Sequence, residues 1–161
     1  GGGANTLSIS SNDTANQSVA VAIGGGGLDL GGALTLTNNN ILSTGKIVGL
    51  TVSGDTEVAG ATTLTAGTGA GDAVGIINTG NAIYAGVGLD AGAGVGANAV
   101  LSLNGVTNQV DTVGFGDSGS SAQGQLCFDG EKRSFSCANW HSTRYCLAHG
   151  RSRPYKRKLL R

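Results

Sequence analysis

Apolar and polar residues alternate in short runs along residues 1–120, and glycine or asparagine separates many of these runs. Alternation over roughly four to eight residues is typical of a half-buried β-strand, because successive side chains point to opposite faces. No helical period is sustained in this part of the chain. The pattern predicts an all-β body of short strands near residues 6–10, 18–23, 28–30, 33–37, 47–48, 51–68, 73–77, 82–85, 99–103 and 106–115.

The most regular pattern is the segment TVSGDT EVAGAT TLTAGT at residues 51–68, which reads as three consecutive hexads. Each hexad has an aliphatic residue at its second position and a threonine at its sixth: Val52, Val58 and Leu64, then Thr56, Thr62 and Thr68. A fixed period indicates stacked repeats. We expect the aliphatic side chains to be buried on one side and the threonines to occupy equivalent places. The spacing also fits a left-handed parallel β-helix, in which three hexads form one triangular coil.

The composition limits the size of the core. Glycine accounts for 30 of 161 residues, and aromatic residues for only 4%, so little side-chain area is available for burial and much chain entropy is lost on folding. We therefore expect an extended β-solenoid or trimeric β-fibre, with self-association as a homotrimer. The chain has no methionine and begins GGGAN, which suggests an internal piece of a longer reading frame.

The charge distribution divides the chain into two parts. Residues 1–120 contain eight acidic residues and one lysine, whereas residues 121–161 contain nine Lys or Arg and two acidic residues. We expect 1–120 to be a Gly/Thr/Ala-rich β-repeat fibre segment. We expect 121–161 to be an irregular, basic, Cys-containing tail, either out-of-frame or disordered; a tail that binds an acidic partner is the alternative. No run of 18 apolar residues occurs, so no membrane span is expected.

Three segments of the body resemble known repeats. GLTVSGDTEVAGATTLTAGTGAGD at 49–72 resembles the strand repeats of bacteriophage tail fibres and large bacterial surface adhesins. SVAVAIGGGG at 18–27 is similar to the SVAIG-type head repeat of trimeric autotransporter adhesins, and LTLTNNNILSTGKIVGLTV at 34–52 to their stretches with an Asn-rich turn. The SVAIG-like motif occurs once here, and neither a neck motif nor a membrane-anchor segment is recognisable. The resemblance implies an extended, trimeric β-fibre that is secreted or exposed on a virion.

The expected function is that of a non-catalytic structural or adhesive segment of an extracellular fibre on a bacterial cell or virion surface. A host-surface or extracellular-matrix ligand would bind through regions outside this chain. A bacteriophage tail fibre segment is the alternative, and a left-handed β-helix acyltransferase is a less favoured one. Such an enzyme needs a general base, most often histidine, and residues 1–120 contain none. The sequence therefore assigns no catalytic residue, cofactor or metal ligand.

Acidic residues beside glycine provide a further candidate site. Asp55, Asp72, Asp90 and Asp117 lie in or near Gly-containing turns, as in calcium-binding repeats, but no repeated GGxGxD unit is present. We interpret them as solvated turn residues. The tetrapeptide GDSG at 116–119 matches the surroundings of a trypsin-like nucleophile, yet no histidine precedes His141, so chance explains it.

The C-terminal stretch contains all the cysteines and histidines of the chain, namely Cys127, Cys137, His141, Cys146 and His149. Structural zinc sites usually begin with two closely spaced cysteines, and no such pair occurs, so zinc is not expected. Residues 151–161 are strongly basic. With a single tyrosine for stacking, nucleic-acid binding is not expected, and a solvated tail is the simpler interpretation.

Overall fold

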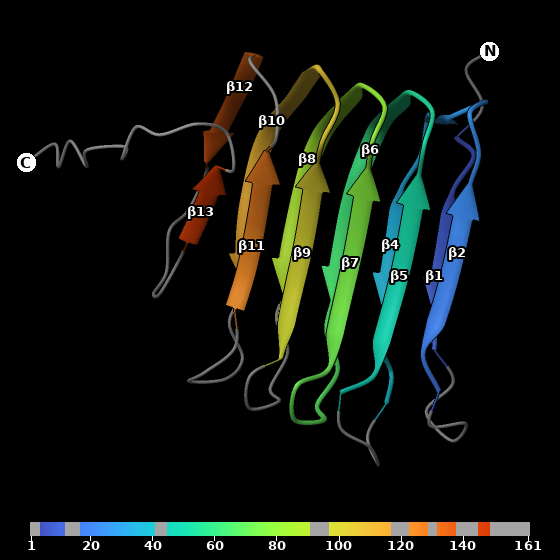
Figure 1. Ribbon diagram of the computed structural model, residues 1–161, viewed down its shortest axis with the longest axis vertical. Coiled ribbons are helices and arrows are strands. Elements are labelled where there is room, and N and C mark those ends of the chain that lie inside the picture. Colours follow the sequence, from blue (N-terminus) through green and yellow to red (C-terminus); the bar gives the residue numbers. More distant parts are fainter. Residues whose placement is uncertain are drawn as a thin grey trace, which may run out of the picture.

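The computed structural model describes residues 4–11, 17–40, 45–90, 97–116, 123–128, 132–137 and 145–148, with side chains described as far as residue 114. Within these ranges the chain forms strands, turns and bends, and no helix. The strands stack as a parallel β-solenoid of about four turns (Figure 1). The predicted all-β short-strand repeat is therefore confirmed, in its solenoid form.

In chain order the strands are β1 (Leu7–Ser10), β2 (Val19–Ile23), β3 (Leu28–Leu30), β4 (Leu34–Thr37), β5 (Ile47–Val52), β6 (Thr56–Thr65), β7 (Ala73–Asn78), β8 (Ala82–Asp90), β9 (Asn98–Leu103), β10 (Thr107–Gly116), β11 (Gln123–Phe128), β12 (Lys132–Cys137) and β13 (Tyr145–Ala148). As far as β10 the strands lie at the predicted segments, although β5 and β8 extend further along the chain than predicted.

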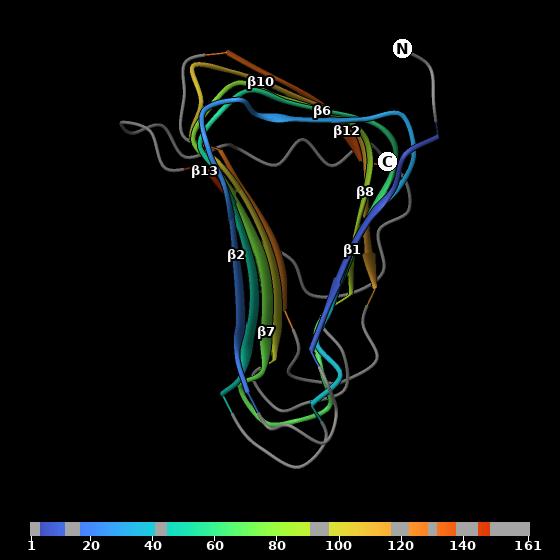
Figure 2. The same cartoon turned by 90° about the vertical axis from the view of Figure 1, so that its right-hand side faces the viewer.

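Two parallel sheets form the walls of the solenoid. Sheet A has the order β1-β4-β6-β8-β10-β12, with β3 also paired to β6, and sheet B has the order β13-β11-β9-β7-β5-β2. Figure 1 shows the strands of sheet B side by side in front of those of sheet A. Viewed along the axis, the outline is three-sided, because sheet B makes one side while the strands of sheet A bend and make the other two (Figure 2).

The bend in sheet A coincides with a shift in strand register. In the pairing of β6 with β8, the register shifts between Val58 and Ala61. Residues before the shift pair with β3 and residues after it pair with β4. The chain therefore turns a corner within β6 without leaving the sheet, and Gly60 lies at this corner.

Successive coils differ slightly in length. Val48 pairs with Val74, and Val74 pairs with Ala99. The second of these two coils is therefore shorter than the first by one residue. The coil before them is longer than either, because Val19 pairs with Val48. A coil is thus longer than the three hexads of the predicted triangular repeat, because it also contains the chain between sheet A and sheet B.

A single aliphatic core runs inside the triangle. Val52 in β5 and Val58 and Leu64 in β6 are all completely buried. They lie on the three sides of one coil, because Val58 precedes the bend of sheet A and Leu64 follows it. The predicted burial of the three hexad aliphatics is confirmed. The core is closed within one chain, so the fold itself does not require the second and third copies of a trimeric fibre; the oligomeric state stays a prediction.

The hexad threonines follow the prediction only in part. Thr56 and Thr62 are buried, each at the first inward position after a corner. Thr68 is exposed in a bend, so the prediction that it occupies an equivalent place is wrong. The reason is that β6 ends at Thr65 and the chain then leaves the sheet.

Glycine stacks on glycine at the corner that leads from sheet B into sheet A. A Cβ atom added to Gly27, Gly54, Gly80 or Gly105 would lie under 3.0 Å from backbone atoms of the neighbouring coil. The backbone ladder also continues beside this corner: Thr79 N donates to Val52 O at 2.9 Å, and Asn104 N to Asn78 O at 2.8 Å. These glycines allow the coils to approach as closely at the corner as they do within the sheets.

Three strands lie beyond residue 120, inside the stretch expected to be irregular. β11 pairs with β9, β12 pairs with β10, and β13 pairs with β11, so they extend both sheets. These segments are strands because the free edges of β9 and β10 offer backbone groups that a following coil can pair. The division of the chain at residue 120 itself stays a prediction, and the other residues of 121–161 lie outside the described ranges.

Tyr84 has the largest side chain among the fully buried residues, and its hydroxyl is buried without a hydrogen-bond partner in the structure. Its Cα partners are Val58 and Val110, both of which are completely buried. Burial raises the pKa of the Tyr84 phenol well above its usual value. The interior therefore favours the neutral form of this side chain.

We expect the free energy of unfolding to decrease as the pH rises above about 10, where the unfolded Tyr84 loses its proton and the folded one retains it. The slope would approach about 1.4 kcal/mol per pH unit. Below about pH 10 both states are protonated, so Tyr84 contributes no pH dependence. Urea denaturation of wild type and Tyr84→Phe at about pH 8 and pH 11 checks this. The phenylalanine variant should lose part of the alkaline slope; equal slopes would contradict the prediction.

Candidate functional site

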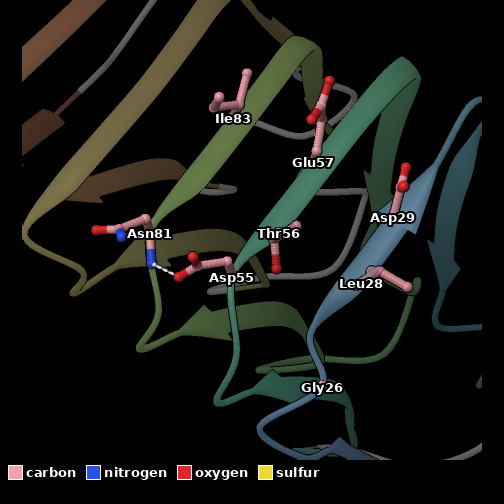
Figure 3. A pocket seen from close by; sticks show the side chains of 8 residues that line it. All are labelled: Gly26, Leu28, Asp29, Asp55, Thr56, Glu57, Asn81 and Ile83. Carbon is pink, nitrogen blue, oxygen red and sulfur yellow. Dashed lines mark hydrogen bonds between the residues drawn. The ribbon is translucent and has the colours of Figure 1, made fainter.

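An acidic groove of about 320 Å³ lies on the outer surface where β3, β6 and β8 run side by side (Figure 3). Its lining consists of Gly26, Leu28, Asp29, Asp55, Thr56, Glu57, Asn81 and Ile83. Three of these residues are carboxylic acids with exposed side chains. No basic residue is among them, so the groove presents negative charge to solvent.

Two of the carboxylates are stacked on adjacent strands. Asp29 pairs with Glu57, which pairs with Ile83 on the next strand. Like charges directly opposite one another in a sheet are destabilising, and a bound cation would relieve this. However, no group of three or more His, Cys, Asp or Glu side chains with the geometry of a metal site occurs among the described residues. The groove therefore has negative charge but not the ligand set of a metal centre.

The remaining carboxylate of the groove takes part in the folding of the next coil. Asp55 Oδ1 accepts a hydrogen bond from Asn81 N at 2.9 Å, as Figure 3 shows. In the following coil, Asn81 Oδ1 accepts one from Thr107 N at 2.9 Å. Asp55 and Asn81 therefore have the same structural role in successive coils: each side chain accepts a hydrogen bond from a backbone N–H of the next coil. We assign Asp55 this structural role.

The other predicted acidic residues lie elsewhere. Asp72 is completely buried, and its carboxylate accepts hydrogen bonds from Lys46 N at 2.9 Å and Gly69 N at 3.1 Å. The interpretation of Asp72 as a solvated turn residue is therefore wrong, because the carboxylate closes the connection between β6 and β7. Asp90 is the half-buried last residue of β8, and Asp117 lies outside the described residues. The structure does not bring these acids together into one site.

A second polar cluster closes the connection that follows β4. Asn38 and Asn40, in the predicted turn, are buried together with Ser11. Asn38 Nδ2 donates to Lys46 O at 2.8 Å and Ala73 O at 3.0 Å, and Asn40 Nδ2 donates to Asn38 Oδ1 at 2.7 Å. These amides satisfy backbone carbonyls where the ladder is interrupted, so their role is structural.

The candidate residues of the C-terminal stretch are only partly described. Cys127 and Cys146 lie in strands of sheet B and Cys137 in a strand of sheet A. His141, His149, Ser118 and the basic residues 151–161 are outside the described ranges, so their arrangement stays a prediction. Among the residues that the structure does describe, no helix has the length and apolar character that a membrane crossing requires.

An uncharged hollow on the outer face of sheet B is the other candidate. A shallow groove of about 300 Å³ lies over β5, β7 and β9. Its floor contains Gly49 and Gly75, which are direct Cα partners, and the exposed side chains of Ile47 and Ile77 lie beside it. Four strands of this face have described side chains, namely β2, β5, β7 and β9, and their outward residues are uncharged: Ala20, Ala22, Ile47, Gly49, Thr51, Ala73, Gly75, Ile77, Asn98, Val100 and Ser102.

This face was not predicted from the sequence. The available signal was the similarity of IVGL at 47–50 to AVGI at 73–76, which lies one coil further along the chain. That period is visible only if the coil length is known, and the hexads suggested a shorter coil. With this period, Gly49 and Gly75 fall on one outward row.

The fold defines the class of this protein as a parallel β-solenoid. Comparisons with protein-family models, with curated proteins and with solved structures give no match to this chain.

Proposed function

We propose that this chain is a non-catalytic structural or adhesive segment of an extracellular surface fibre, where stacked coils set the length and stiffness of a rod. The observation that carries the proposal is the single core that passes through successive coils, each held to the next by parallel strand pairing. Such a segment grows in length by repetition alone. Recognition of a ligand would then belong to regions outside this chain.

The proposed setting is a bacterial cell surface, and a bacteriophage tail fibre is the alternative. Both settings require a long, stiff rod, which stacked coils with small side chains can form. This setting follows from the resemblance of the repeats at 18–27, 34–52 and 49–72 to those of surface adhesins and tail fibres. An antiserum against the chain should label intact cells or virions that carry the gene. Labelling that appears only after cell lysis would overturn the proposed location.

The mechanical role predicts how the chain responds to force. When the protein is pulled through tags at its two ends, we expect it to resist and then lengthen in coil-sized steps. The coil in which Val48 pairs with Val74 would release about 90 Å of extended chain. Single-molecule force spectroscopy measures these increments, with Val58→Asp, which disrupts the core, as the control. If the native chain extended smoothly without force peaks, as the control should, it would not be a load-bearing rod.

A further inference from the structure

We propose that the outer face of sheet B, centred on Gly49, Gly75 and Ile77, pairs with the same face of a second copy of this chain to form a two-fold symmetric dimer. The proposal depends on the fold alone and does not require the fibre function, and it differs from the homotrimer that the sequence led us to expect. Three observations support it, namely unneeded glycines, lack of charge and exposed isoleucines beside a hollow, and the size of the face sets how strong the dimer is.

The glycines in the hollow are not required by packing within the chain. A Cβ atom on Gly49 would meet only Ile47 Cγ2, at 4.0 Å, and one on Gly75 would meet only Val100 O, at 3.5 Å. Both are ordinary contact distances, unlike those at the corner glycine Gly54. Glycine in a strand weakens it, and a residue with a side chain would fit here. The absence of side chains in the hollow is therefore better explained by a partner molecule that packs against it from outside.

The distribution of charge favours a second copy as that partner. Among residues with described side chains, six are acidic and only Lys46 is basic. Asp29, Asp55 and Glu57 are all exposed on the outer surface of sheet A. Two copies that met through sheet A would bring like charges together, which costs free energy on association. The uncharged face of sheet B is the surface where the same chain can meet itself without this penalty.

The face is also complementary to itself in shape. Ile77 is 46% exposed and Ile47 is 52% exposed, and they lie beside the glycine floor. A two-fold axis makes each contact occur twice. In our proposal Ile77 enters the hollow over Gly49 and Gly75 of the partner subunit, while the partner's Ile77 enters the hollow of the first copy.

The size of the face predicts a weak dimer. The four strands of this face whose side chains are described, at about 4.8 Å spacing and each about 20 Å long, cover roughly 400 Å² per copy, and β11 and β13 extend the sheet beyond them. A stable complex buries about 800 Å² per partner. We therefore expect the weak, transient association that is typical of small interfaces. The face would become a stronger interface with each coil added to the solenoid.

Sedimentation equilibrium of the full chain from low micromolar to millimolar concentration tests the proposal, with a reductant present so that the three cysteines cannot link copies. We expect a monomer–dimer equilibrium. Gly75→Val, which fills the hollow with a strand-favouring residue, should weaken dimerisation at least tenfold while the far-UV circular dichroism and melting temperature are retained or improved. Ile77→Thr should weaken it similarly.

Two variants on the other sheet provide matched controls. Ile83 is 45% exposed, nearly the same as Ile77, and Ile83→Thr should leave dimerisation unchanged. Gly88 in β8 has room for a side chain, so Gly88→Val controls for filling a glycine. A chain that stays monomeric throughout, one that forms trimers, or a dimer that Gly75→Val and Ile77→Thr leave intact would overturn the proposal. Equal weakening by Ile83→Thr would do so too.

Discussion

Replacing Val58 with Asp should unfold the solenoid at neutral pH. Val58 is completely buried, and its Cα partners are Leu30 and Tyr84 in the adjacent coils. A carboxylate at this position would have no charge partner, and burial of an unpaired acid raises its pKa by several units, equivalent to about 4 kcal/mol at pH 7. The total stability of a domain is about 5–15 kcal/mol. We expect loss of the strand signal in far-UV circular dichroism and of a cooperative thermal transition.

The pH dependence separates charge from shape in this variant. Burying a neutral carboxyl group costs less free energy than burying a carboxylate, so the Val58→Asp protein should recover part of its structure below about pH 4. Val58→Ala, which loses volume without adding charge, should melt cooperatively at a lower temperature. Thr63→Asp places the same charge on the outer face of the same strand, where the Cα partners Thr35 and Gly88 are uncharged, and should be tolerated. A Val58→Asp protein that melts like wild type would show that the hexads are a feature of composition only.

Replacing Gly80 with Ala should destabilise the protein by about 2–4 kcal/mol, because overpacking against rigid backbone exceeds the usual cost of an added methyl group. Its Cβ would collide with the carbonyl group of Gly54 in the preceding coil and approach Asp55 N at 2.8 Å. The obstructing atoms are backbone in a hydrogen-bonded corner, so relief requires the two coils to separate. Urea denaturation gives the change in free energy of unfolding.

Gly114→Ala is the matched control for Gly80→Ala. A Cβ on Gly114 meets nothing within 4 Å, and Ala in a strand loses less entropy on folding than Gly does, by about 0.5–1 kcal/mol. The control should therefore be neutral or slightly stabilised. If the two substitutions had equal effects, the corner would be looser than the structure shows.

The strands were predictable because their signal is local. Alternation at residues 18–23 and an apolar run of strand length at 99–103 are enough to define β2 and β9, and the hexads correctly placed Val52, Val58 and Leu64 in the core. The full extent of β8 was missed, since glycines at 86 and 88 made that segment resemble a break. In the structure, pairing with β6 and β10 on both sides holds this segment in a strand.

The candidate sites were harder to predict because they depend on the coil length. Asp29 and Glu57 are separated by a full coil of the chain, and nothing local indicates that they are stacked. Asp72 has the sequence context of a solvated turn, but it is completely buried and its carboxylate accepts hydrogen bonds from Lys46 N and Gly69 N. Both outcomes follow from which residues lie one coil apart, and the hexads alone suggested a different spacing.

The two connections between the sheets differ in how freely their length varies. From sheet B to sheet A, three residues join β5 to β6, β7 to β8 and β9 to β10, at 53–55, 79–81 and 104–106, and four join β2 to β3 at 24–27. From sheet A to sheet B, the connections at 38–46 and 66–72 are longer and differ from each other in length. One inserted residue that slipped the register at the short corner would reverse inward and outward positions in the strand that follows. The long connections can absorb insertions outside the ladder, so new sequence, including a grafted epitope, would be accommodated along that one edge of the solenoid.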